Sequence, residues 1–524
     1  LITRSMEAYP PPLHLWLSLA LTRWTGDPNI AGHWVHLIML LLTLGFIFAL
    51  VRHLAGNITG MFSVFFYLHT RNLVQRMTCG VPRGWAGPVL AAFLYFLCTK
   101  NHWGVILTLF FGTLLHPPSA FMCAATYGLY LFVGVLWNRT RLEFMPNFAR
   151  YLVVAPIIAF VAFVTVQRSP DIGSMVTYEQ AKRIPALQRH GGRFPFVPMK
   201  DAFFELNTVG IQAFVNRWEP EEIWVRRNMT PLLYGFFCVL LLIQWRTRRE
   251  LFPPELLVYV ISIFIVYFLS RELAYRLYVP DRHLQFPLNT FFIVAFPVAI
   301  WRLFHPLTLT GGFRQTEWRY ALRPSVALLY LGVFIFWTAG SGLEGQANFN
   351  YRMDTRPGLY SYVRTTPLTS MFASHPGRID PLQLLGQRKA YVTTETAHPF
   401  YDAYYKTIQE RLQVVFRAFY AGSLEELLAT VEPARIDYFV YFYEDFLPEK
   451  MAKASYTQPF RKWVNRLAQK YPRDQYVGVR YASVPPEGEY PFVAYRDGEC
   501  FVVDIAKLRE YLNASADAKP QDGK

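Results

Sequence analysis

Long apolar runs recur along the first two thirds of this chain, and they constrain its fold more than any other feature. They occupy residues 34–51, 54–70, 85–98, 103–115, 119–137, 148–166, 230–245, 256–269, 286–301 and 325–339. A helix that crosses a bilayer needs about 20 mostly apolar residues, and several runs approach that length. Only 17% of the 524 residues are charged, against about 25% in a typical soluble domain. The sequence predicts a mainly α-helical polytopic membrane protein with about ten transmembrane helices, give or take two.

The pattern changes near residue 343. Apolar β-rich runs at 389–396, 437–442 and 491–505 alternate there with helical stretches at 401–420 and 456–471, and Ser423 precedes another helix as a capping residue. This alternation predicts an α/β soluble domain over 343–512, followed by a disordered tail over 513–524. Residues 1–33 form a first external segment with an interfacial helix at 13–24, and 34–342 form the transmembrane domain, including an external loop over 167–228.

Basic residues set the predicted topology. The 52 Lys and Arg exceed the 37 Asp and Glu, and no aromatic–basic motif points to nucleic acid. Short basic loops follow the runs that end near residues 137, 245 and 301, so the positive-inside rule makes that face cytoplasmic. Parity then places residues 1–33, the loops at 71–83 and 271–283, and the C-terminal domain on the external face. Six arginines fall on that face, where basic residues are normally depleted: Arg71, Arg76, Arg83, Arg271, Arg276 and Arg282.

These external arginines are candidate phosphate ligands, because a guanidinium forks onto phosphate oxygens and keeps its charge. Arg282 stands out, since it lies with His283 between Pro280 and Pro287 at the mouth of a helix. Arg276, Arg271 and Arg83 are further candidates. The alternative is that each arginine anchors headgroups generally or pairs with nearby acids.

Three other residues near the external face carry candidate chemistry. Glu7 could act as a general base, or it is a solvated residue near the start of the chain. His14 and His116, beside prolines, could help to bind a metal or a headgroup, although capping of helix ends is the more common role. The chain starts with Leu1 rather than Met, and we expect a further membrane helix upstream.

Several function classes are disfavoured. The sequence has no P-loop, GxGxxG, GxSxG or HExxH motif, which argues against an ATPase, a Rossmann enzyme, a serine hydrolase and a zinc protease. Charge within the apolar runs is scarce, which argues against a proton-driven transporter. The five cysteines form no CxxC pair, so neither a disulfide framework nor a sulfur-based metal site is expected.

Three stretches resemble a known family: YPPPLHLWLSLALTRWTGDP at 9–28, GVPRGWAGPVLAAFLYFL at 80–97 and DRHLQFPL at 281–288. They are similar to segments of class C (GT-C) membrane glycosyltransferases, including uncharacterised bacterial members. The resemblance implies a polyprenyl-phosphate sugar donor, membrane lipids as neighbours and inverting transfer on the external side of a bacterial cytoplasmic membrane. It implies Glu7 as base or ligand of a divalent cation, and Arg282 with Arg276 on the lipid phosphate.

The chain also departs from that family, which usually has more acids in the first external loop and a helix before it. An alternative is therefore a non-catalytic membrane scaffold or accessory subunit, whose external domain docks a protein partner. Loss of transfer in Glu7→Gln and Arg282→Ala would favour the enzyme, and loss of a co-purifying complex would favour the subunit.

Overall fold

The fold is given by a computed structural model of the chain. It describes residues 11–70, 73–74, 76–77, 80–137, 145–152, 155–156, 159, 172–188, 191–192, 223–248, 250–273, 280, 282–304, 328–332, 356–486 and 488–517. Contacts group the chain into two compact units. The membrane unit contains Tyr9–Gln167 and Val197–Asn350, and the C-terminal unit contains Leu1–Ala8, Arg168–Phe196 and Tyr351–Lys524.

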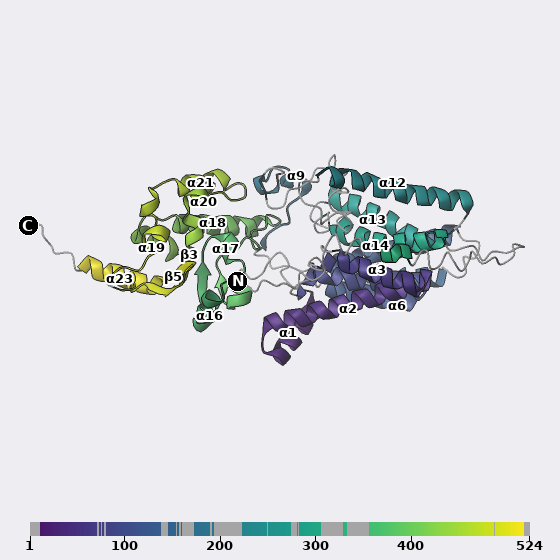
Figure 1. Cartoon of the computed structure of the whole chain (residues 1–524), viewed down its shortest axis with the longest axis horizontal. Helices are drawn as coiled ribbons and strands as arrows, with labels where there is room; N and C mark the ends of the chain where they lie inside the picture. Colours follow the sequence, from purple (N-terminus) through teal and green to yellow (C-terminus); the bar gives the residue numbers. More distant parts are fainter. Residues whose placement is uncertain are drawn as a thin grey trace, which may run out of the picture. The chain divides into compact units, whose positions relative to one another are not determined.

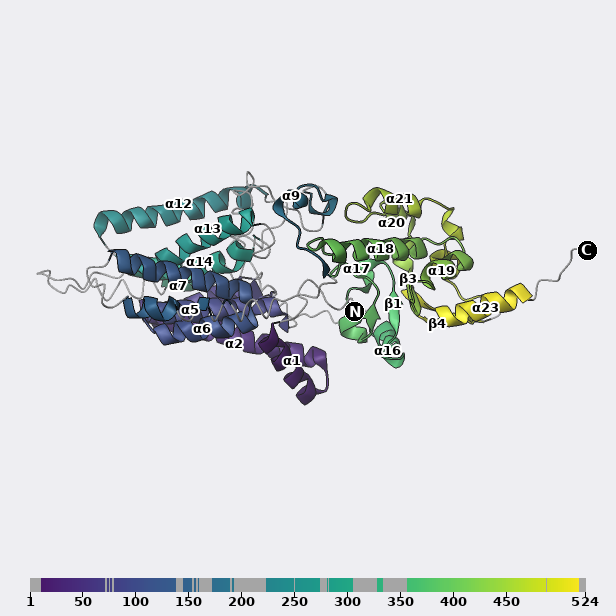
Figure 2. The same cartoon turned by 180° about the vertical axis from the view of Figure 1, so that it is seen from behind.

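The membrane unit is a bundle of helices that run side by side (Figures 1 and 2). Its elements are α1 (Pro12–Thr25), α2 (Pro28–Ala55), α3 (Asn57–His69), η2 (Pro82–Trp85), α5 (Ala86–Cys98), α6 (His102–Leu115), α7 (Pro117–Trp137), α12 (Ile223–Thr247), α13 (Pro254–Glu272) and α14 (Arg282–Phe304). Single residues, Gly56 and His116, join α2 to α3 and α6 to α7. Because such short connections reverse the chain, consecutive helices are antiparallel and their ends gather at two opposite ends of the bundle.

Local chemistry sets the limits of the longest helix, α2. The Asp27 carboxylate accepts a hydrogen bond of 2.7 Å from the Asn29 N–H, and Pro28 occupies the first helical position. Both features stabilise a helix start. At the other end, Gly56 has a φ of 87°, a value that suits glycine, and α3 begins at once. The sequence therefore fixes both the start of α2 and its turn into α3.

Helix α14 forms the centre of the bundle. In its most apolar 18-residue window 89% of the residues are buried, the largest share among the four candidate spans. Phe291, Phe292 and Val294 on successive sides of the helix are all at most 1% exposed. A helix that is apolar all round is enclosed by neighbours, and this explains why α14 holds the most protected polar positions of the unit.

The predicted number of membrane spans is wrong for the part of the chain that is described. Four described helices are long and apolar enough to cross a bilayer: Pro28–Ala55, Pro117–Leu136, Pro254–Glu272 and Arg282–Leu303. The runs at 54–70, 85–98 and 103–115 form helices of 13 or 14 residues, about 20 Å long, whereas the hydrocarbon core is about 30 Å thick. The runs at 148–166 and 325–339 lie largely outside the described residues. A helical, membrane-type protein is confirmed, and the described residues contain four helices of spanning length rather than about ten.

The C-terminal unit contains a mixed five-stranded sheet of order β2-β1-β3-β5-β4. Strand β1 (Met371–Ala373) pairs in parallel with β2 (Lys389–Ala390) and β3 (Tyr438–Phe442), whereas β5 (Cys500–Asp504) is antiparallel to β3 and β4 (Val493–Arg496). The other elements are α9 (Tyr178–Ala181), η4 (Pro185–Leu187), α16 (Pro357–Thr365), α17 (Pro376–Ile379), η9 (Leu382–Gly386), α18 (Asp402–Phe419), α19 (Leu424–Val431), η10 (Tyr443–Phe446), α20 (Pro448–Ala452), α21 (Arg461–Ala468), η11 (Arg473–Gln475), α22 (Val477–Arg480) and α23 (Ile505–Asp517).

Helices cover both faces of this sheet, and α16 and α18 lie on opposite sides (Figures 1 and 2). Along β3, Val440 and Phe442 join the core under α16, whereas Tyr441 faces α18. The Tyr441 hydroxyl donates to the Ala418 carbonyl at 2.8 Å, and its ring stacks on Phe419. This alternation follows from the two-residue period of a strand. The C-terminal unit thus combines a small sheet with helices on both of its faces.

Part of the predicted external loop packs on the C-terminal unit. The Val176 N–H donates to the Phe400 carbonyl at 3.0 Å, and Met175 forms an isolated antiparallel bridge with Tyr401. The Ser174 hydroxyl donates to Asp402 at 2.6 Å. Residues 172–188 thus belong structurally with the C-terminal unit, whereas residues 193–222 of the predicted loop lie outside the described residues.

Candidate functional site

Ion pairs and hydrogen bonds fasten one end of the membrane bundle. Lys100, after α5, contacts the Glu255 carboxylate at the start of α13, whose side chain is only 5% exposed, and it donates to the Tyr130 hydroxyl of α7 at 2.8 Å. Arg302, in the last turn of α14, donates to the Glu250 carbonyl at 2.9 Å. These contacts join elements that the sequence separates by up to 155 positions. This end therefore has an evident structural role.

The opposite end brings together the starts of α7 and α14. His116 is the connecting residue before α7, and its ring meets Phe286 of α14 edge to face, with 6.2 Å between ring centroids. In return, Phe121 of α7 meets His283 of α14 at 6.4 Å. The dipole makes a helix start attractive to anions, although the start of α7 offers no free N–H, because Pro117 and Pro118 have none and the Ser119 and Ala120 N–H groups donate to the His116 carbonyl. Two such starts lie together here, and we call this place the α7–α14 mouth.

A buried polar row continues from the mouth along α14. Arg282, half-buried, donates to the Gln285 side-chain oxygen, and the Asn289 amide donates to the Gln285 carbonyl. His283, Gln285 and Asn289 are 2%, 2% and 0% exposed. Polar groups at such depth in a membrane protein are costly and usually mark a functional path or a specific internal contact. The contact with Gln285, one turn further along α14, thus holds the Arg282 side chain at the mouth.

His116 is held as an acceptor at the same mouth. The Ser119 N–H donates to its Nδ1 at 3.3 Å, and the Ser119 hydroxyl lies 2.9 Å from the same atom. Burial is the main cause that lowers the pKa of His116, to about 3, and the nearby His283 and Arg282 side chains lower it further by electrostatic repulsion. The imidazole is therefore neutral at physiological pH, and its Nε2 carries the proton, since Nδ1 accepts. The mouth keeps a neutral donor beside a permanent cation.

Arg271 lies in the last turn of α13, on an element that packs against α14. It is 2% exposed and donates to the Tyr267 hydroxyl at 2.9 Å, with its guanidinium 5.5 Å from the same ring centroid. An arginine that is satisfied by a tyrosine hydroxyl and a ring face is held rigidly. Its described contacts thus give Arg271 an evident packing role.

Of the remaining predicted site residues, Arg83 and His14 lie within the described part of the chain, whereas Glu7 and Arg276 do not. Arg83 is exposed in η2, two residues before Trp85, whose indole N–H donates to His14 Nδ1 at 3.1 Å. Burial lowers the pKa of His14 to about 4, so His14 fastens α1 to η2 as a neutral acceptor. Glu7 and Arg276 lie outside the described residues. Within the described ranges, no cluster of three or more His, Cys, Asp or Glu side chains could hold a metal ion.

The structure adds residues that the sequence interpretation did not select. Ser119, Gln285 and Asn289 lie at the mouth or along α14, and His116 is buried there. A usable signal existed: Gln285 and Asn289 are four residues apart in an apolar run, so they share one face of a helix. The pattern HPPS at 116–119 likewise marks a polar cap between two apolar helices. Chemically, the mouth offers a cation, neutral donors and two helix starts, which together suit an anion.

Fold and site define a class: a helical membrane protein with an α/β C-terminal domain and an electropositive mouth at one end of its bundle. No family model matches the chain, and neither does any curated protein. Among solved structures, the chain is similar to the apo oligosaccharyltransferase of Archaeoglobus fulgidus, with a TM-score of 0.50 and 12% identity, over 88% of this chain and 64% of that one.

Two related solved structures give weaker matches, each at 12% identity and over 88% of this chain. They are the A. fulgidus oligosaccharyltransferase with zinc and sulfate, at a TM-score of 0.41, and AglB from A. fulgidus with an inhibitory peptide and a dolichol-phosphate, at 0.43. The chain spans 62% and 64% of their lengths. The match at 0.50 shows that the chain shares a fold with that oligosaccharyltransferase.

Proposed function

We propose that this protein is a membrane glycosyltransferase that takes a sugar from a polyprenyl-phosphate donor. The observation that carries the proposal is the α7–α14 mouth, where the helix start with Arg282 and His283 packs beside the helix start with the buried His116–Ser119 pair. A lipid-linked phosphate has its charge at the bilayer surface and its chain in the apolar region, and a bundle end with these groups suits both parts. The fold shared with an oligosaccharyltransferase supports the same class of reaction.

The proposed reaction is an inverting displacement at the anomeric carbon. The nucleophilic atom of the acceptor forms a bond to that carbon, and the bond from the carbon to the phosphate oxygen breaks. The acceptor gives its proton to a carboxylate, for which Glu7 is our candidate, and the polyprenyl phosphate leaves with one more negative charge. Arg282 would stabilise that charge, because a guanidinium gains more from the fully charged leaving group than from the bound donor. Arg276, Arg271 and Arg83 are secondary candidates, and we place the mouth on the non-cytoplasmic side.

A binding experiment tests the donor site without knowledge of the sugar. The full chain, in nanodiscs of neutral lipid, is titrated with undecaprenyl phosphate as the probe. Arg282→Ala should weaken binding about tenfold or more, since a charge-assisted contact is lost, and Arg282→Lys should recover part of it. The matched control is Arg52→Ala, which removes an exposed cation from the last turn of α2. Equal binding by wild type and Arg282→Ala would refute the site.

The catalytic part of the proposal has its own test. Glu7→Gln should abolish the formation of glycoconjugates in cells that depend on this protein while leaving undecaprenyl phosphate binding unchanged, because the change removes a base and not a phosphate ligand. Unchanged glycoconjugates, together with loss of a co-purifying protein, would instead favour the non-catalytic scaffold.

A further inference from the structure

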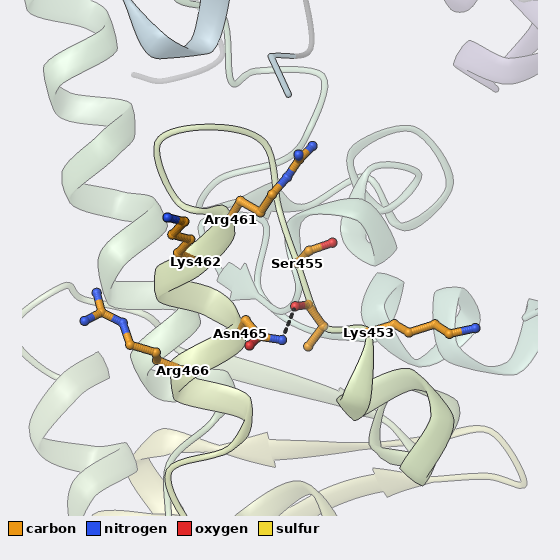
Figure 3. A pocket seen from close by; sticks show the side chains of 7 residues that line it. Lys453, Ser455, Arg461, Lys462, Asn465 and Arg466 are labelled. Carbon is orange, nitrogen blue, oxygen red and sulfur yellow. Dashed lines mark hydrogen bonds between the residues drawn. The ribbon is translucent and has the colours of Figure 1, made fainter. Parts of the chain in front are cut away.

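A cavity in the C-terminal unit is lined almost entirely by basic and neutral polar side chains. It lies between the end of α20 and the exposed face of α21, has a volume of about 600 Å³, and is bordered by Lys453, Ser455, Arg461, Lys462, Asn465 and Arg466 (Figure 3). Its lining contains four cations and no carboxylate. We call it the α21 cavity. Its size falls in the range of small-molecule sites, about 300–1,000 Å³.

The core fixes the orientation of the helix that carries most of this charge. Val464 and Ala468 of α21 are 0% and 3% exposed, and the Trp463 ring packs edge to face on Phe416 of α18. The helix therefore cannot rotate its basic face away from the cavity without exposing its apolar face. Figure 3 shows Arg461, Lys462 and Arg466 projecting from α21, and the Asn465 amide donating to the Ala454 carbonyl at 3.2 Å.

The placement of these cations runs against local helix energetics. Arg461 and Lys462 are the first two residues of α21, whose first turn contains no acid, although the dipole favours negative charge at a helix start. Lys462 and Arg466 are also like charges four residues apart. Local rules are usually broken where a function requires it. An anion bound in the cavity would remove both unfavourable terms.

Several other cations of the same unit pair with carboxylates. Arg378 pairs with Asp445, Arg496 with Glu489 and Lys470 with Glu426. By contrast, over the described part of the chain the four cations of the α21 cavity form no ion pair.

We propose that the α21 cavity binds a phosphate-bearing ligand. Guanidinium and ammonium groups together with a hydroxyl and an amide provide the charge and the hydrogen-bond donors that phosphate oxygens accept. The ligand is either a soluble phosphorylated compound or the headgroup of an anionic lipid, since both present the same chemistry. This site is separate from the α7–α14 mouth, and it does not depend on glycosyl transfer.

The test uses the full chain in nanodiscs and pyrophosphate as the soluble probe. In neutral-lipid nanodiscs, affinity is measured by calorimetry for wild type, for K453A/K462A/R466A and for the control K389A/K406A/K507A, and hydrogen exchange of residues 453–466 is followed with and without pyrophosphate. The control removes the same number of exposed cations elsewhere on the unit. The first variant keeps Arg461, because its guanidinium lies against the backbone at Gly191. A second arm follows hydrogen exchange of residues 453–466 in nanodiscs that contain phosphatidylglycerol, without pyrophosphate.

A soluble ligand predicts that pyrophosphate binds wild type and protects residues 453–466, that K453A/K462A/R466A weakens binding about tenfold or more, and that the control stays within about twofold. A lipid source predicts that phosphatidylglycerol alone gives this protection in wild type and in the control, but not in K453A/K462A/R466A. The proposal is overturned if neither ligand protects residues 453–466 in wild type. It is equally overturned if the control loses as much binding or protection as the cavity variant.

Discussion

His375 makes the stability of the C-terminal unit depend on pH. Its Nδ1 accepts a hydrogen bond of 3.3 Å from the Gly377 N–H at the start of α17. Its ring lies edge to face against Phe416, Phe419 and Tyr456, with centroid distances of 5.4, 5.5 and 6.3 Å. Burial lowers the pKa of His375 from 6.5 to about 4. Protonation would place a charge among aromatic rings and would also remove the acceptor of the cap.

The sign and size of the effect follow from linkage. Because the folded pKa lies below the unfolded one, the unfolded chain binds more protons between pH 6.5 and about 4. The stabilisation is complete above the unfolded pKa and is lost as the pH falls toward the folded pKa. At pH 5 the loss from this one group is about 2 kcal/mol, and below the folded pKa it approaches about 3 kcal/mol as an upper limit.

The assay compares the full chain with His375→Asn by pulse proteolysis of the C-terminal unit in urea at pH 7.5 and pH 5. Asparagine can cap α17 through its side-chain oxygen but does not titrate. Between the two pH values, wild type should lose about 2 kcal/mol more unfolding free energy than the variant. The other histidines contribute equally to both proteins and cancel. The same loss in both proteins would refute this account of His375.

Three further predictions concern packing and charge. Arg378→Met should lower the unfolding free energy of the C-terminal unit by about 2–3 kcal/mol, because Asp445, 14% exposed, loses its partner. Urea unfolding would measure the loss, and adding Asp445→Asn to the variant should recover part of the lost stability. Lys100→Met should destabilise the membrane unit by about 1–3 kcal/mol, because the buried Glu255 carboxylate loses the cation that pairs with it. Thermal unfolding in detergent would detect the loss of stability. If adding Glu255→Gln recovers no stability, the unpaired carboxylate is not the cause. Gly87→Ala should lower the stability of the membrane unit by about 1–3 kcal/mol, since the new Cβ would lie 2.5 Å from Met77 Cε and 2.8 Å from Thr43 Oγ1. Gly45→Ala is the control, because a Cβ at that position meets nothing within 4 Å. Equal losses of stability in the two variants, measured by thermal unfolding in detergent, would exclude the steric explanation.

The candidate site was predictable where local sequence dictates local structure. The prolines at 280 and 287 and the apolar run after Arg282 indicate a helix that starts there, and α14 begins at Arg282. The position of His283 in the first turn follows directly. By contrast, the partners of these residues come from α7, more than 150 positions earlier, and no local pattern reports which helix packs beside α14.

The strands show the same limit. The runs at 437–442 and 491–505 contain β3, β4 and β5, because alternation and β-branched or aromatic residues favour strands. Of the run at 389–396 only Lys389 and Ala390 form a strand, and β1, Met371–Ala373, was not predicted. A three-residue strand carries almost no periodicity of its own, so it is defined by its parallel pairing with β2 and β3.

The sequence by itself determined that the chain is a helical membrane protein with an α/β domain at its end, since apolar run length and strand–helix alternation are properties of neighbouring residues. Tertiary structure decided how many described helices are long enough to span a bilayer and that α14 lies at the centre of the bundle. It also decided that the α7 start, with His116 and Ser119, packs beside the α14 start, with Arg282 and His283, and that Lys453 and the cations of α21 border one cavity. The physical reason is that burial and charge proximity arise between segments far apart in the chain, where sequence spacing carries no information about distance.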